Sequence, residues 1–118
     1  MFRAVPWSRQ AAGCEGQELA AAHARYGWHL MMQRRFAEAR ACYAEARALD
    51  PLSLLYRTHE ALIALYERDF TRCQAGLDAV LDVAPEHLLA QALRAALMLY
   101  AGRLDEGLAA YQALHARS

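Results

Sequence analysis

The sequence contains no lysine: all 13 of its basic residues are arginines, and 13 acidic residues balance them to a formal net charge of zero. Nucleic-acid-binding proteins usually carry a basic excess, so this balance argues against that function. No stretch reaches the roughly 18 apolar residues of a membrane span, and the opening MFRAVPWSRQ has no apolar signal core. We therefore expect a cytoplasmic protein with no nucleic-acid or membrane partner. The Arg-only, Ala-rich usage is typical of a GC-rich bacterial genome.

Cysteine is scarce as well. Cys14, Cys42 and Cys73 are odd in number and form no CxxC pair, which indicates free thiols in a reducing compartment. The segment HEALI at 59–63 lacks the second histidine of an HExxH zinc site. No histidine or cysteine has a second ligand at metal-binding spacing, and no nucleophile elbow or phosphate loop occurs. We expect no enzyme, no metal and no cofactor.

The sequence does contain an internal repeat, in a chain of 118 residues that is 57% hydrophobic and long enough for one folded domain. Residues 34–51 read RRFAEARACYAEARALDP, and residues 68–85, which lie 34 positions later, read RDFTRCQAGLDAVLDVAP. A third copy starts at Gly102. A repeat of this length is the signature of an array of similar structural units.

Helical periodicity runs through each copy. Apolar and small residues recur at three- and four-residue intervals, and no segment alternates for long enough to form a strand. We therefore predict an all-α fold of six helices in three pairs. Residues 1–16 show no sustained period and are predicted to be an irregular N-terminal arm, and 17–118 to be a single domain, with repeats at about 20–53, 54–87 and 88–118.

The repeat resembles the tetratricopeptide repeat (TPR), a 34-residue helix–turn–helix unit with the pattern W-x2-L-G-x2-Y, A-x3-F and P. The resemblance covers about residues 20–118, although the Trp is missing from all three copies. The matching positions in the first copy are His23, Tyr26, Gly27, Leu30, Ala39, Tyr43 and Pro51. Those in the later copies include Ala61, Cys73, Leu77, Pro85, Ala95, Gly107 and Tyr111.

The resemblance implies a short right-handed superhelical solenoid of three stacked repeats. Small residues such as Gly27, Ala61 and Ala95 would let the two helices of a repeat approach closely, and bulky Tyr43 and Leu77 would fill the space beside them. No polar capping helix follows the last helix in this sequence, so its apolar residues favour a homodimer or another partner at that end.

The resemblance also implies a concave groove, which the first helices of the repeats line and which binds a protein partner. The implied groove residues are mostly apolar or aromatic, and such a lining suits an apolar or amphipathic segment, helical or extended. We expect Trp28, Met31, Leu62, Leu65 and Tyr100 to carry affinity together with Leu99. The full set is Ala24, Trp28, Met31, Met32, Leu55, Thr58, Leu62, Leu65, Tyr66, Leu89, Ala92, Ala96, Leu99 and Tyr100.

Two more specific interpretations follow from the groove. TPR co-chaperones grip a C-terminal carboxylate with Lys, Arg and Asn, whereas the matching positions here are Ala24, Trp28, His59, Leu89 and Leu93, so that clamp is absent. In size, repeat number and groove character the chain is similar to the small TPR chaperones of bacterial type III secretion. The alternative function is a self-assembling structural unit, a homodimer or stacked scaffold, whose groove is filled by its own chain.

Overall fold

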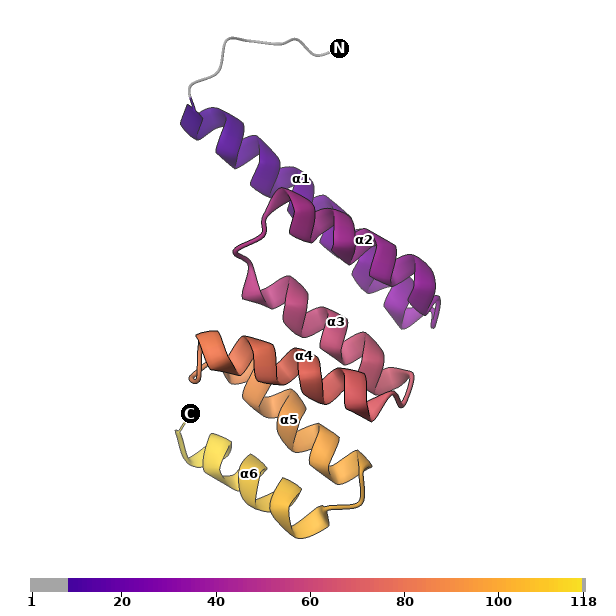
Figure 1. Cartoon of the computed structure of the whole chain (residues 1–118), viewed down its shortest axis with the longest axis vertical. Helices are drawn as coiled ribbons and strands as arrows, with labels where there is room; N and C mark the ends of the chain where they lie inside the picture. Colours follow the sequence, from indigo (N-terminus) through magenta and orange to yellow (C-terminus); the bar gives the residue numbers. More distant parts are fainter. Residues whose placement is uncertain (1–8, 118) are drawn as a thin grey trace. The chain divides into compact units, whose positions relative to one another are not determined.

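The protein is all-α in the part of the chain described by the computed structural model, residues 9–117, where six helices and no strand occur. The helices follow one another with short connections (Figure 1). Their bounds are α1 (Arg9–Met32), α2 (Phe36–Leu49), α3 (Leu54–Tyr66), α4 (Phe70–Val83), α5 (Leu88–Tyr100) and α6 (Leu104–Arg117). The prediction of six helices in three pairs is confirmed.

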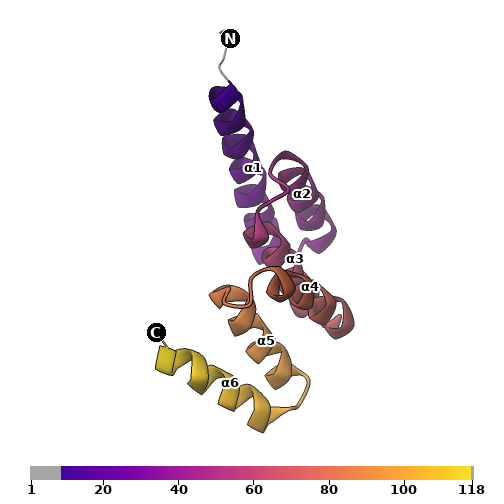
Figure 2. The same cartoon turned by 60° about the vertical axis from the view of Figure 1, so that its left-hand side comes forward.

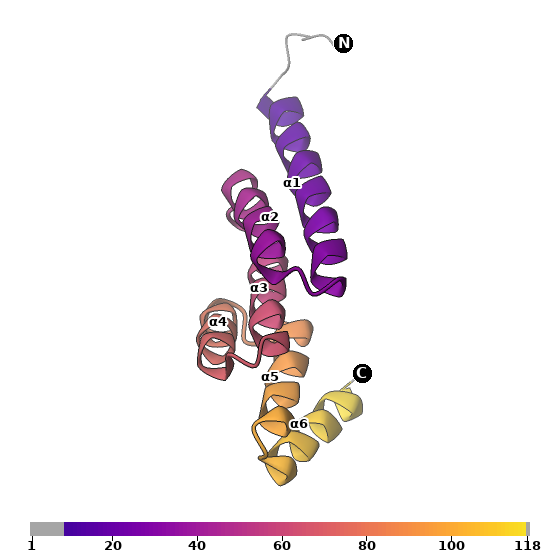
Figure 3. The same ribbon diagram turned by 90° about the vertical axis from the view of Figure 1, so that its right-hand side faces the viewer.

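The helices fall into two compact units, which divide after Ser53. In the first unit, α1 and α2 run side by side as a hairpin (Figure 2). In the second unit, α3 packs against α4 and α5 against α6, and α5 also contacts both α3 and α4. Figure 3 shows α5 between α4 and α6. The prediction of one domain over 17–118 stays a prediction.

The first helix begins earlier than expected, because α1 starts at Arg9 and not near Gln17. The prediction of an irregular arm over 1–16 is therefore wrong for residues 9–16, and residues 1–8 lie outside the described part of the chain. Gly13 and Gly16 both lie inside the helix, and each glycine costs a helix only about 1 kcal/mol relative to alanine. The neighbouring Ala and Gln residues offset that cost.

The turn inside each repeat has the same backbone conformation at the same repeat position. Arg34, Arg68 and Gly102 all have positive φ, of 64°, 64° and 84°. Each is followed by a residue whose N–H donates to a carbonyl five residues earlier, which is the Schellman arrangement that ends a helix. These bonds are Arg35 to Leu30 (2.9 Å), Asp69 to Ala64 (2.9 Å) and Arg103 to Met98 (2.8 Å).

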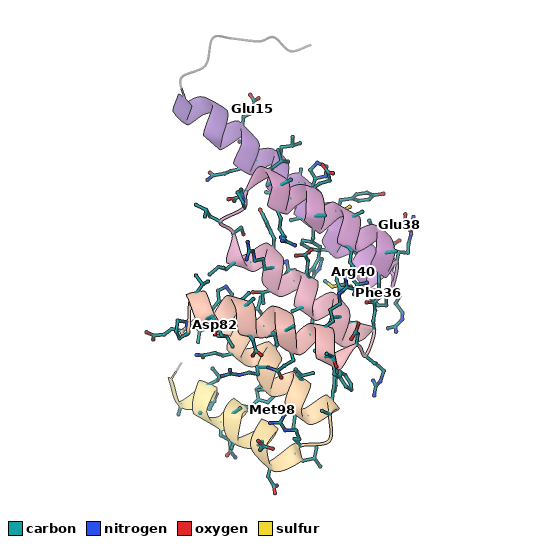
Figure 4. The ribbon with its side chains drawn as sticks, viewed as in Figure 1. Glu15, Phe36, Glu38, Arg40, Asp82 and Met98 are labelled. Carbon is teal, nitrogen blue, oxygen red and sulfur yellow. The ribbon has the colours of Figure 1, made fainter. Side chains whose placement is uncertain are left out.

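The starts of the second helices are also equivalent. Arg35 donates two hydrogen bonds to the Glu38 carboxylate, at 2.7 and 2.6 Å, and Figure 4 labels Glu38 beside Phe36 at the start of α2. Arg103 holds Glu106 in the same way, at 3.0 Å for both bonds. In the middle repeat the acidic residue comes first, and the Asp69 side chain instead accepts from the backbone N–H three residues on, at 3.2 Å. The turns therefore share a geometry but not a set of side chains.

Close helix approach occurs where the small residues predict it. A Cβ atom at Gly27 would lie 2.9 Å from Cε2 of Tyr43, whose side chain is completely buried. A Cβ atom at Gly107 would lie 2.7 Å from Leu99 Cδ2 and 3.1 Å from the Ala95 carbonyl oxygen. In the middle repeat, Gly76 lies against Ala61. The small residues thus set the distance between the two helices of each repeat.

Candidate functional site

The predicted groove residues are divided between the two units. Ala24, Trp28, Met31 and Met32 belong to α1, in the first unit. The other ten belong to α3 and α5, which contact each other in the second unit. We refer to these ten as the α3–α5 face: Leu55, Thr58, Leu62, Leu65, Tyr66, Leu89, Ala92, Ala96, Leu99 and Tyr100.

On α1, two of the four predicted residues are accessible. Trp28 is 39% exposed and Met32 is 49% exposed, and they are four residues apart, on one side of the helix. Met31 and Ala24 are buried. A partner that reaches this part of α1 would therefore meet an indole ring and a flexible thioether.

On the α3–α5 face, three residues are buried. Thr58 is fully buried, and its hydroxyl donates to the Leu54 carbonyl at 2.8 Å, so it offers no hydrogen-bonding group to a partner. Leu62 and Leu65 are also buried. Replacing either by a charged residue would disrupt the packing of the helices, so a loss of binding in such a variant would not identify a binding residue. A partner-binding role for these three residues stays a prediction.

The other seven residues of the face are accessible to different degrees. Leu55 is 45% exposed and Tyr100 is 50% exposed. Leu89, Leu99 and Tyr66, together with Ala92 and Ala96, are half-buried. The accessible part of the face is therefore apolar and aromatic, and two phenolic hydroxyls are its polar groups.

The Tyr100 ring has a cationic neighbour that the sequence did not reveal. The Arg68 guanidinium carbon lies 5.9 Å from the centroid of the Tyr100 ring and 5.8 Å from that of Phe70, within the range of a cation–π interaction. The sequence predicted a turn at this position but no ring contact. The sequence did contain a signal for the backbone conformation of the turn. Arg34 and Arg68 align with Gly102, and glycine is the residue type that most readily adopts positive φ.

The histidine on α3 lies where burial disfavours its charged form. His59 is half-buried, and its burial lowers the pKa of the imidazole below the ordinary value of 6.5. It occupies one of the five positions at which a carboxylate-gripping TPR would carry Lys, Arg or Asn. A lowered pKa disfavours the positive charge that could bind a carboxylate at this position.

The two described thiols are poor nucleophiles. Burial, with a smaller effect of Asp69, raises the pKa of Cys73 to about 11. Burial and the Glu38 carboxylate raise the pKa of Cys42 as well. Within residues that the structure describes, no group of three or more His, Cys, Asp and Glu side chains is placed to hold a metal ion. None of the described helices is long and apolar enough to cross a membrane.

No family model matches the sequence, and no curated protein sequence matches it. Solved structures do match. The second TPR of Spaghetti (RPAP3), bound to the HSP90 peptide SRMEEVD, superposes with a TM-score of 0.70 at 17% identity, over 88% of this chain and 95% of that one. The chain has the TPR fold.

Other TPR domains agree. The first TPR of Spaghetti (RPAP3), also bound to the HSP90 peptide SRMEEVD, gives a TM-score of 0.69 at 18% identity, over 83% of this chain and 78% of that chain. The Arabidopsis OM64 TPR domain gives 0.69 at 16% identity, over 84% and 82%. The TPR fold accounts for the 34-residue spacing of the three Schellman turns and for the small residues between paired helices.

Proposed function

We propose that this TPR protein is a protein-interaction module that binds an apolar helical or extended protein segment, as a small cytoplasmic chaperone or adaptor. The observation that supports this most directly is the exposure of Leu55 and Tyr100 on neighbouring first helices. Leu55 lies at the start of α3 and Tyr100 at the end of α5, so the exposed apolar and aromatic residues span the length of the face, as is typical of protein-binding surfaces. The resemblance to type III secretion chaperones favours the chaperone form of this proposal.

The structural neighbours support a peptide ligand but differ in the chemistry they recognise. The HSP90 peptide SRMEEVD and the HSP70 peptide SGPTIEEVD, which RPAP3 domains bind, both end in EEVD and so carry three acidic side chains beside the C-terminal carboxylate. Such ends require cations in the binding site. This chain has Ala24, Trp28, Leu89 and Leu93 at the corresponding positions, together with His59, whose pKa is lowered by burial. We therefore propose an apolar ligand in place of an acidic one.

The test is a selection of peptides on the whole protein from a displayed random library, followed by binding titrations. We expect selected peptides to be apolar or amphipathic, and the synthetic peptide SRMEEVD not to bind. Leu55→Asp should abolish binding of the selected peptides. Leu88→Asp is the matched control, because Leu88 is 57% exposed and lies in the first turn of α5 as Leu55 lies in the first turn of α3, but it is outside the predicted set.

Both substitutions place a carboxylate in the first turn of a helix, where the helix dipole favours it, so both variants should keep wild-type helicity. Tight binding of SRMEEVD that Leu55→Asp leaves unchanged would contradict the proposal and indicate recognition of a C-terminal carboxylate. Equal loss of binding in the two variants would contradict the assignment of the α3–α5 face.

A further inference from the structure

One side of α4 packs against the helix that follows it. The residues on this side recur at intervals of four, three and four, which keeps them on one helix face. Leu77 is fully buried and Leu81 is 8% exposed. Phe70 and Gln74 line a hollow of about 400 Å³ together with Leu97 and other residues near the end of α5. This side of α4 is therefore the surface on which α5 lies.

The equivalent side of α6, 34 residues later, is open. Leu104 is 63% exposed, Leu108 is 55% exposed and Tyr111 is 38% exposed, and His115 is exposed as well. We call these four residues the α6 stripe. The close contact of α6 with α5 is made through Gly107, and α6 is the last helix that the structure describes, with α5 on one side of it (Figure 3).

The α6 stripe has one polar exchange in each direction relative to α4, because Leu108 stands where α4 has Gln74 and His115 stands where α4 has Leu81. Its spacing of four, three and four is that of the seam between two paired helices. We propose that two copies of the chain pair through this stripe, with their α6 helices antiparallel. In the dimer, the α6 helix of each copy would cover the α6 stripe of the other, as α5 covers the equivalent side of α4.

The side chains beside the stripe favour a second copy in this orientation. A twofold axis near the middle of α6 places Leu108 beside the partner's Tyr111 and Leu104 beside the partner's His115. Asp105 and Gln112 each come directly after a stripe residue, Leu104 and Tyr111. In an antiparallel pair, residues that flank the seam in this way face each other across it. Asp105 then faces the partner's Gln112, and a carboxylate accepts a hydrogen bond from an amide. Both residues are exposed in the single chain.

The orientation also suits the charges at the helix ends. Asp105 and Glu106 occupy the first turn of α6, and a parallel pair would bring these acidic turns together. An antiparallel pair separates them and opposes the helix dipoles. A 14-residue helix is only about 21 Å long, so the contact falls below the roughly 800 Å² per partner of a standard interface, and we expect a weak, concentration-dependent dimer.

The test is sedimentation equilibrium of the full chain across the micromolar range. We expect the wild type to pass from monomer to dimer as its concentration rises. Leu108→Asp should abolish the dimer, because it places two carboxylates in an apolar seam. Leu88→Asp, an equally exposed leucine outside the stripe, should leave the dissociation constant unchanged.

Gln112 tests the orientation without disturbing the helix, since it is exposed. Gln112→Glu places a second carboxylate opposite the partner's Asp105, and this happens twice in each dimer by symmetry. It should therefore raise the dissociation constant about two- to fivefold. Gln112→Arg creates two opposite-charge pairs and should lower it. A wild type that stays monomeric throughout, or the reverse order of the two Gln112 variants, would overturn the proposal. A monomer would leave the stripe to a helix of another protein.

Discussion

The guanidinium of Arg68 lies over the ring of Tyr100, with 5.9 Å between the guanidinium carbon and the ring centroid. The contact joins the turn between α3 and α4 to the C-terminal end of α5. Arg68 also has a φ of 64°, which is unfavourable for a residue with a Cβ atom. One side chain therefore combines a backbone cost with a contact between two repeats.

Replacing the two positive-φ arginines by glycine should separate these effects. Arg34→Gly relieves a strained backbone and loses one ring contact, that with Phe36 at 5.4 Å. Arg68→Gly relieves the same strain but loses two ring contacts, each worth about 0.5–1 kcal/mol. In urea denaturation we expect Arg34→Gly to be more stable than Arg68→Gly by about 0.5 kcal/mol or more. Equal stabilities would show that the Tyr100 contact contributes nothing.

The glycines between paired helices should differ in their tolerance of alanine. A methyl group at Gly27 would meet the fully buried Tyr43 ring at 2.9 Å. Overpacking of this kind costs about 1–3 kcal/mol, against the about 1 kcal/mol that alanine gains in a helix. We expect Gly27→Ala to lower the free energy of unfolding.

Gly76→Ala is the comparison, because its methyl group would lie 3.3 Å from the Ala61 Cβ atom. We expect its stability to fall within about 1 kcal/mol of the wild type, as the helical gain and the tight contact nearly cancel. If Gly76→Ala were the more destabilised of the two, Tyr43 would have to move aside readily, and the close approach at Gly27 would not be a rigid feature.

The Cys73 thiol should make stability depend on alkaline pH. Its pKa is raised from 9.0 to about 11 in the folded chain, so the stabilisation is complete below pH 9 and is lost as the pH rises towards 11. We expect the free energy of unfolding to fall over this range, and to fall less in Cys73→Ala. In the native protein the same thiol should resist alkylation at neutral pH until the chain unfolds.

His59 should make stability depend on mildly acidic pH. Burial lowers its folded pKa below 6.5, so the unfolded chain binds a proton first and stability falls as the pH drops from 6.5 towards the folded value. Above pH 6.5 this contribution is fully present. His59→Gln should flatten the pH dependence in that window, and an unchanged slope in this variant would assign the effect to other groups.

Much of the fold could be predicted from the repeat. The alignment of Phe36 with Phe70 and of Pro51 with Pro85 placed the second helices, and α2 and α4 end one residue before Asp50 and Ala84, which donate to carbonyls four residues earlier. These features are local, since turn and helix-end chemistry depends on a few neighbouring residues. The start of α1 was missed because isolated glycines in an Ala-rich helix look like breaks.

The accessible part of the site was harder to predict. Periodicity identifies a buried face when a helix has one open side, but Ala61 through Leu65 are buried without interruption. Around these residues α3 has no open side, so the pattern gave no means of separating buried Leu62 from exposed Leu55. The Arg68–Tyr100 contact depends on the approach of α5, and Tyr100 lies 32 positions after Arg68 in the chain.

The open side of α6 has a consequence for how such an array grows. Leu104, Leu108 and Tyr111 already present the surface that α4 presents to α5. A further 34-residue unit joined after α6 would therefore find an exposed, mostly apolar helix face at the position that receives α5 on α4. Each added unit would again end in a helix with an exposed apolar face. Arrays of this kind could therefore differ in length by whole repeats.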